Sequence, residues 1–296
     1  MSRIYEALRR SGSRLADLGQ TGAGRRAGHV GAAEAGGEGP MDALADTAGA
    51  EGLPADELAQ VPVERVKLEE SSRIVFRADT DDPGADRFRF LRMRLREYWT
   101  MGKLRTLVVT SPHAGDGKST VVLNLATALA EGGKRSVVVV EGDHYRPAIG
   151  RALGLEAAPG LAECLADGLD PVAALRRIEP LQWHLLQAGK SERNRTELLQ
   201  SDALAGVLGR LRRLFDWVLI DTPPVIPLAD TLVMARHSDA TLLVVRADKT
   251  PAEAVEEALT LLGPKQVLGM VLNGAETVNQ MYSKYYGYYK PRGGVS

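Results

Sequence analysis

The sequence is poor in cysteine: Cys164 is the single one among 296 residues. One cysteine excludes an intramolecular disulfide framework, and a reducing, cytosolic compartment is the simplest interpretation. Long apolar runs are also missing. Segments such as 107–110 and 137–140 are strand-sized, whereas a bilayer-spanning helix needs roughly 20 apolar residues. The first residues lack the apolar stretch of a secretory signal. We therefore expect a chain that does not cross a membrane by itself.

An excess of one charge sign is absent as well. The 37 basic and 38 acidic residues give a formal charge of -1, which argues against a surface that binds nucleic acid or anionic lipid over its whole extent. The hydrophobic content of 44% is ordinary for a folded core, and the length allows one large domain with appendages. We expect any basic function to be local, and we expect no nucleic-acid partner.

Composition divides the chain into four segments. Residues 1–18 place apolar side chains at helical spacing among arginines and predict a short amphipathic helix. Residues 19–72 begin as a Gly- and Ala-rich stretch with too little apolar surface to offset its ordering entropy, so we expect a disordered linker. Residues 73–280 carry the folded domain, and residues 281–296 form a tyrosine-rich tail.

Within the folded domain, short Val-, Leu- and Ile-rich strands alternate with helical patterns. The expected strands are 73–77, 106–110, 136–140, 184–187, 216–220, 240–245 and 266–272. The expected helices are 86–99, 121–130, 148–175, 203–214, 229–235 and 252–262. This alternation predicts an α/β fold in which a mostly parallel sheet is flanked by helices on both faces.

The segment from Ser111 to Thr120 reads SPHAGDGKST and lies between an expected strand and an expected helix. Its glycines let backbone N–H groups turn toward an anion, the helix N-terminus favours negative charge, and Lys118 can reach the outer phosphates of a nucleotide. Ser119 offers its hydroxyl to magnesium, so we predict binding of ATP with Mg²⁺. Pro112 stands where the common pattern has Gly. The residues expected to hold the nucleotide here are Ala114, Gly115, Asp116, Gly117, Lys118, Ser119 and Thr120.

Acidic residues follow two further expected strands. Glu141 and Asp143 leave the end of one strand, and Asp221 leaves the end of another. Because ligands of open α/β sheets bind at the carboxyl ends of strands, we expect these carboxylates to converge on the phosphates. Phosphoryl transfer needs metal coordination and an oriented nucleophile. We therefore expect the three acids and Lys118 to be catalytic, and Ser119, Asp143 and Asp221 to hold the metal.

Tyrosine is concentrated near the C-terminus, where five of the eight tyrosines lie in one short stretch. These five are Tyr282, Tyr285, Tyr286, Tyr288 and Tyr289. Interleaved Gly, Ser and Lys predict a mobile tail. A stacking platform for single-stranded nucleic acid would also use such aromatics, and a tail without function is a third interpretation. A tyrosine hydroxyl, with a pKa near 10, needs a carboxylate to take its proton, so the economical inference is that the tail is the substrate of the phosphate site.

Together these features resemble the bacterial tyrosine kinases of capsule and exopolysaccharide synthesis, the BY-kinase family, in its form without a fused membrane segment. The resemblance extends from about residue 73 to the C-terminus and implies a P-loop NTPase fold of the SIMIBI or MinD type. Asp86, Arg89 and Arg92 are similar to the family's Glu-x-x-Arg-x-x-Arg helix of ring assembly. The family implies a homo-oligomeric ring whose subunits phosphorylate each other's tails, after which accumulated phosphate charge separates them.

The resemblance also implies partners and a location. Family members without a membrane segment are activated by a separate transmembrane protein, a chain-length regulator of the polysaccharide co-polymerase type. A tyrosine phosphatase is the expected counterpart of the kinase. The chain would then be cytoplasmic and peripheral at the inner face of the membrane through its partner.

Departures from the family pattern leave two alternatives open. Glu141 stands where the family usually has Asp, and one extra methylene moves the carboxylate by roughly an angstrom, a scale on which catalysis is sensitive. An ATP-binding scaffold that transfers no phosphate is one alternative. The other is a cell-positioning ATPase of the MinD/ParA kind, in which a second lysine takes the place of His113.

Asn273 ends the last strand where this fold class often reads the nucleotide base, and Arg246 could face the same pocket.

Overall fold

The computed structural model describes residues 54–68, 73–76, 83–190, 195–199 and 202–275. The chain divides into two compact units, Met1–Glu57 and Leu58–Ser296, and the sheet belongs to the second unit. The helix expected at residues 1–18 and the tyrosine-rich tail at residues 281–296 lie outside the described residues.

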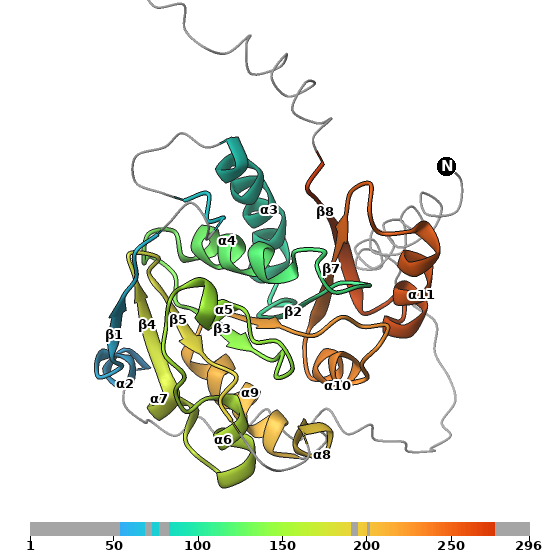
Figure 1. The fold of residues 1–296 in the computed structure, drawn as a ribbon. Coiled ribbons are helices and arrows are strands. Elements are labelled where there is room, and N and C mark those ends of the chain that lie inside the picture. Colours follow the sequence, from blue (N-terminus) through green and yellow to red (C-terminus); the bar gives the residue numbers. More distant parts are fainter. Residues whose placement is uncertain (1–53, 69–72, 77–82, 191–194, 200–201, 276–296) are drawn as a thin grey trace, which may run out of the picture. The chain divides into compact units, whose positions relative to one another are not determined.

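The described residues of the second unit form an eight-stranded sheet (Figure 1). In spatial order its strands are β1 (Val63–Arg65), β4 (Leu175–Glu179), β5 (Trp183–Leu186), β3 (Val137–Glu141), β6 (Trp217–Asp221), β2 (Thr106–Thr110), β7 (Ala240–Arg246) and β8 (Val267–Asn273). The strands β5, β3, β6, β2, β7 and β8 are parallel to one another. β1 and β4 run in the opposite direction. The predicted α/β class with a mostly parallel sheet is confirmed.

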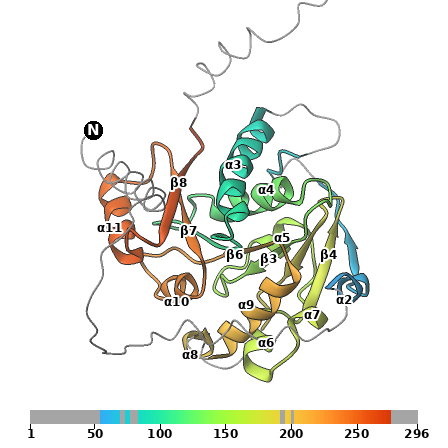
Figure 2. The ribbon, with the colours of Figure 1, turned by 180° about the vertical axis from the view of Figure 1, so that it is seen from behind.

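Helices cover both faces of this sheet, as the two opposite views in Figures 1 and 2 show. The described helices are α2 (Pro54–Ala59), α3 (Pro83–Thr100), α4 (Lys118–Ala130), α5 (Ile149–Ala152), α6 (Leu161–Asp167), α7 (Pro171–Ala174), α8 (Arg195–Leu199), α9 (Asp202–Leu214), α10 (Asp230–Arg236) and α11 (Ala252–Leu262). One face packs against α3 and α4, and the other packs against α6, α8 and α9. None of the described helices is long and apolar enough to span a bilayer.

The inner positions of β2, β3 and β6 are apolar because both faces of these strands are buried. In β3, Val137 and Val139 belong to the core under α3 and α4, whereas Val138 and Val140 belong to the core under α6 and α9. Successive side chains of a strand point to opposite faces, so only an unbroken apolar run satisfies both cores. Cys164 is buried in the second core, as expected for a lone cysteine.

The helix expected over residues 148–175 is wrong. This stretch forms three short helices, α5, α6 and α7, and then enters β4. Gly154 and Gly168 adopt φ angles of 69° and 70°, which end a right-handed helix. In β4 only Leu175 and Ile178 are buried, so this strand lacks the continuous apolar run by which the central strands were predicted.

The fold also extends into the stretch expected to be a linker. Residues 54–59 form α2, and residues 63–65 form β1, which pairs with β4 at the edge of the sheet. The short strand expected at residues 73–77 is not formed by its described residues, 73–76. Instead the Val75 N–H donates to Asn124 Oδ1 of α4 at 2.8 Å, so a side chain takes the place of a strand partner.

Candidate functional site

The phosphate loop connects β2 to α4 and has the open geometry that an anion requires. Gly115 and Gly117 adopt φ angles of 90° and 95°, a region in which glycine is favoured because it has no Cβ. A Cβ at Gly117 would lie 2.0 Å from Asn273 Nδ2, so no other residue fits there without displacing its neighbour. His113 to Gly115 are exposed, which leaves this part of the loop accessible to a ligand.

Lys118 and two of the predicted acids meet beside this loop. Lys118 Nζ lies 2.9 Å from Asp143 Oδ2 and 3.8 Å from Asp221 Oδ1. The Ser119 hydroxyl donates to Asp221 Oδ2 at 2.6 Å. Lys118 and Ser119 begin α4, which follows β2, while Asp143 follows β3 and Asp221 ends β6. β2 and β3 pair with β6 in parallel on its two sides. The structure therefore brings the side chains of Lys118, Ser119, Asp143 and Asp221 together.

Asp221 is an acid of this cluster with a raised pKa. It is fully buried, and burial raises its pKa from 3.8 to about 6 against the opposing effects of Lys118 and Ser119. Within the described residues its Oδ1 atom accepts no hydrogen bond. A buried carboxylate oxygen with spare acceptor capacity next to a hydroxyl is a reasonable donor set for Mg²⁺.

The described residues contain no group of three or more His, Cys, Asp or Glu side chains arranged to hold a metal ion. Mg²⁺ in nucleotide sites is commonly bound by one or two carboxylates together with substrate phosphates and water. The side chains of Ser119, Asp143 and Asp221 fit that incomplete type of site, which a nucleotide completes.

Glu141 points elsewhere. Its Oε1 accepts the backbone N–H groups of Ile149 at 2.7 Å and Gly150 at 3.4 Å, and its Oε2 accepts that of Ala188 at 3.3 Å. Burial raises the pKa of this carboxyl, and the backbone amides oppose the rise. Glu141 thus joins the end of β3 to α5 and to the chain after β5, and these bonds engage both of its oxygens.

Asn273 and Thr250 contact the phosphate loop from the other side. Asn273 Nδ2 donates to the backbone oxygen of Asp116 at 2.9 Å, and the Thr250 hydroxyl donates to Asp116 Oδ1 at 2.9 Å. The sequence prediction placed Asn273 at the nucleotide base, whereas its side-chain amide is bonded to the loop itself. Thr250 was missed, because a threonine in the β7–α11 connection carries no motif of its own.

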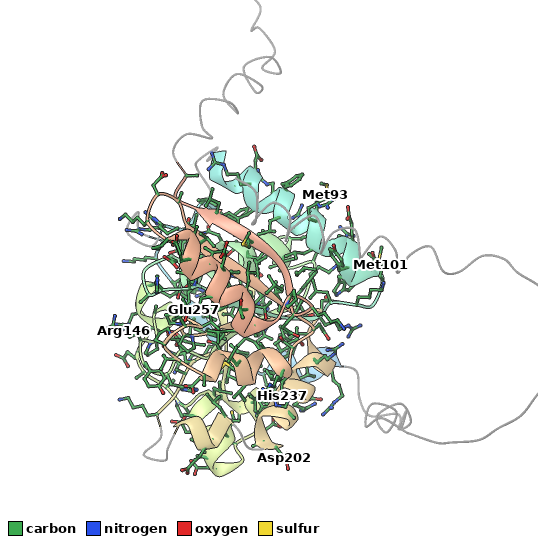
Figure 3. All side chains as sticks on the ribbon, turned by 90° about the vertical axis from the view of Figure 1, so that its right-hand side faces the viewer. Met93, Met101, Arg146, Asp202, His237 and Glu257 are labelled. Carbon is green, nitrogen blue, oxygen red and sulfur yellow. The ribbon has the colours of Figure 1, made fainter. Side chains whose placement is uncertain are left out.

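The three residues expected to mediate oligomerisation lie on α3 but differ in their surroundings. Arg89 Nη1 pairs with Asp86 Oδ1 at 2.6 Å. Arg92 Nη1 donates to the Ala128 carbonyl of α4 at 3.1 Å, so it helps to hold α3 on α4. The exposed surface of α3 also includes Met93, labelled in Figure 3, whose side chain is 52% exposed.

A cavity of about 420 Å³ adjoins the loop that follows β3. His144 and Pro147 of that loop contribute to its wall, together with Ala162 and Leu165 of α6 and with Lys190. His144 directly follows Asp143 in the chain, which places this largely apolar cavity near the carboxyl end of β3.

Comparison with known proteins finds one matching family model and a set of kinase relatives. The ParA model, described as NUBPL iron-transfer P-loop NTPase, matches residues 103–295. The tyrosine-protein kinase CpsD of Streptococcus pneumoniae is 30% identical over 174 residues, which cover 58% of this chain and 76% of CpsD. The tyrosine-protein kinase YwqD of Bacillus subtilis is 27% identical, with 69% of this chain and 86% of YwqD covered.

Some curated relatives are much longer than this chain. It spans 32% of the length of the tyrosine-protein kinase ptk of Acinetobacter johnsonii, at 26% identity over 78% of this chain. Among solved structures, the BceF tyrosine kinase domain is 31% identical with a TM-score of 0.60, covering 67% of this chain and 80% of that domain. The kinase domain of Escherichia coli ETK, at 22% identity and a TM-score of 0.63 over 77% of this chain and 95% of that chain, shares the fold.

Proposed function

Because the chain belongs to the BY-kinase family of polysaccharide biosynthesis and has the ParA/MinD-like P-loop fold, we propose that it is an ATP-dependent protein tyrosine autokinase. Residues 73–280, together with the strand β1 that the sheet adds before them, are the kinase domain in this proposal, and the tyrosines from Tyr282 to Tyr289 are its acceptors. The observation that carries the proposal is the cluster of Lys118, Asp143 and Asp221 beside the phosphate loop.

In this mechanism the loop amides and Lys118 hold the phosphates, while Ser119, Asp143 and Asp221 provide oxygen ligands to Mg²⁺. A bound Mg²⁺ ion neutralises phosphate charge and aligns the transferred group. When the Lys118 ammonium turns to the outer phosphate, Asp143 Oδ2 loses its partner at 2.9 Å, while Asp143 Oδ1 still accepts the N–H of Arg146 at 3.0 Å. Its carboxylate then becomes available to accept the proton of an incoming tyrosine hydroxyl. Glu141 is less suited to that step, because both of its oxygens already accept backbone amides.

The acceptor is proposed to come from a second copy of the chain within a homo-oligomeric ring. Asp86, Arg89 and exposed α3 side chains such as Met93 contribute to the contact between copies. Each added phosphate carries about -1.5 to -2 charges, which favours separation of the phosphorylated copies.

The proposed partners follow the family. The activator is a transmembrane chain-length regulator of the polysaccharide co-polymerase type, which holds the chain at the inner face of the membrane. A tyrosine phosphatase reverses the reaction.

Intact-mass measurement tests the proposal. Protein mixed with ATP, Mg²⁺ and the cytosolic piece of its membrane partner is expected to gain mass in steps of one phosphate, located by peptide mapping to Tyr282–Tyr289. Lys118→Met should abolish the gain, whereas Lys134→Met, which alters an exposed lysine after α4, should not. A chain without the tail should still phosphorylate the tail of the Lys118→Met protein, and failure of this mixing would contradict transfer between copies.

The match to the ParA model supports a second function, an ATPase of the MinD/ParA kind. Such a protein would hydrolyse ATP without gaining mass. A protein that binds ATP but neither hydrolyses it nor gains mass would instead be a nucleotide-dependent scaffold. Phosphate release measured beside intact mass therefore separates the three functions.

A further inference from the structure

Asp116 is an acid in the middle of a loop that is built to bind anions. Its side chain is buried, at 5% exposure. Oδ2 accepts the N–H of His113 at 3.1 Å, and Oδ1 accepts the hydroxyl of Thr250 at 2.9 Å. The backbone oxygen of the same residue accepts Asn273 Nδ2 at 2.9 Å. Asp116 is therefore bonded to the loop itself, to the chain after β7 and to the end of β8.

The Thr250 hydroxyl has one available orientation. Its oxygen accepts the backbone N–H of Arg246 at 3.0 Å, so its proton is directed to Asp116. The Thr250 N–H donates to the Arg246 carbonyl at 3.0 Å, which closes a tight turn before α11. A hydroxyl held on both sides in this way is a rigid support for the loop.

We propose that Asp116, Thr250 and Asn273 form a clasp that fixes the phosphate loop in its binding conformation before the nucleotide arrives. These residues are positioning residues, because they act through the loop backbone. Ordering a flexible backbone costs conformational entropy, and a loop that is ordered in advance does not meet that cost when the ligand binds.

The clasp has a second effect on nucleotide affinity. If the Asp116 carboxylate turned outward, it would place a negative charge beside the phosphates that the loop binds. The bonds from Thr250 and His113 keep this charge buried and neutralised by donors. Loss of the clasp should therefore weaken ATP and ADP alike, since both carry the phosphates nearest to the loop.

The clasp rests on nucleotide binding by the phosphate loop and is tested without any kinase reaction. Thr250→Val keeps the shape of the side chain and removes the hydroxyl, and Thr250→Ser restores it. Thr260→Val is the matched control, because the Thr260 hydroxyl of α11 donates only to a helix carbonyl, that of Glu256. Dissociation constants for ATP and ADP with Mg²⁺ are measured by calorimetry on the full chain, and Tm is measured without nucleotide.

Thr250→Val is expected to raise both dissociation constants about tenfold. This factor corresponds to the lower end of the range for the loss of a hydrogen bond to a charged group. Thr250→Ser should stay within about twofold of the parent, and Thr260→Val should bind as the parent does. Asp116→Ala combined with Thr250→Val should weaken binding no more than Asp116→Ala alone, because both break the same clasp. Thr250→Ala provides the comparison if the valine variant does not fold.

Parental affinity in Thr250→Val, or additive losses in the double variant, would overturn the clasp. A loss that Thr250→Ser does not restore would also overturn it, because the hydroxyl would then not be the group that matters. If the parent binds ATP but never gains phosphate, the kinase proposal fails while the clasp result stands.

Discussion

Replacing Glu141 distinguishes a positioning residue from a catalytic base at the position where the BY-kinase pattern has aspartate. Glutamine keeps the length of the side chain and an oxygen for Ile149, but it cannot act as a base. Aspartate keeps the charge but is shorter by one carbon–carbon bond. Glu141→Gln therefore removes the base and keeps the length, whereas Glu141→Asp removes the length and keeps the charge.

The expected losses of stability follow from the three backbone N–H groups that donate to Glu141. The bond from Ile149 at 2.7 Å is short, and those from Gly150 and Ala188 are long, at 3.4 and 3.3 Å. A hydrogen bond to a charged group contributes about 1.5 to 3 kcal/mol. Glu141→Asp cannot span from β3 to both segments, so we expect a loss of about 2 to 3 kcal/mol and a Tm lower by roughly 5 to 10 °C. Glu141→Gln loses chiefly the weaker contact with Ala188 and should cost about 1 kcal/mol or less.

The same contacts predict the effect on phosphate transfer. If Glu141 positions the loop that carries Asp143, Glu141→Gln should keep the rate of tail phosphorylation within about tenfold of the parent. Removal of a general base typically costs about 10² to 10⁴ in rate. The assay is single-turnover labelling with ATP and Mg²⁺ across pH 5.5 to 9, on roughly half-unit steps, beside calorimetric ATP affinity and Tm. Glu163→Gln is the matched control, because Glu163 also accepts two backbone amides, those of Gly160 and Lys190.

Two results would contradict a positioning role for Glu141. A labelling rate at least about a hundredfold lower in Glu141→Gln, with parental Tm and ATP affinity, would identify Glu141 as the base. A Glu141→Asp variant that labels faster than the parent would show that the shorter acid reaches the phosphates, contrary to its bonds to α5 and to Ala188.

Three further predictions test the site and its support. Because burial raises the pKa of Asp221 from 3.8 to about 6, the native state binds more protons than the unfolded state between these values, and stability falls as pH rises through them. Without nucleotide, Asp221→Asn should therefore raise Tm by roughly 5 °C above pH 6 and flatten the dependence of Tm on pH. A curve of Tm against pH equal to the parent's would contradict the cost of burying the Asp221 carboxylate. Gly117→Ala should weaken ATP binding at least tenfold, because its Cβ would lie 2.0 Å from Asn273 Nδ2, whereas Gly102→Ala, with nothing within 4 Å, should bind as the parent does. Trp99→Phe should lower the free energy of unfolding by about 1 kcal/mol, since the indole N–H donates to a backbone carbonyl before β6 at 2.9 Å, and a denaturant midpoint equal to the parent's would exclude this role.

The sequence alone predicted which side chains gather beside the phosphate loop. A Gly-rich loop between a strand and a helix has few other uses, and acids at the ends of parallel strands must lie at the same edge of the sheet. Lys118, Ser119, Asp143 and Asp221 could thus be placed together without coordinates. The central strands were predicted for a similar reason, because burial on both faces demands an unbroken apolar run.

The strands β1 and β4 could not be predicted in this way. β1 has three residues, none of which is buried, and only two of the five residues of β4 are buried, so neither strand carries such a run. β1 joins the sheet by pairing with β4, which lies more than a hundred residues further along the chain.

The directions of the polar side chains beyond the strand ends could not be predicted from the sequence, because they depend on contacts made in the folded protein. Glu141 and Asp143 are two residues apart, yet one carboxylate accepts amides of α5 and the other pairs with Lys118. Asp116 and Thr250 are 134 residues apart and meet because β2 and β7 are neighbours. The direction of a polar side chain is set by donors that other segments bring within hydrogen-bond distance, and those donors have no fixed spacing in the sequence.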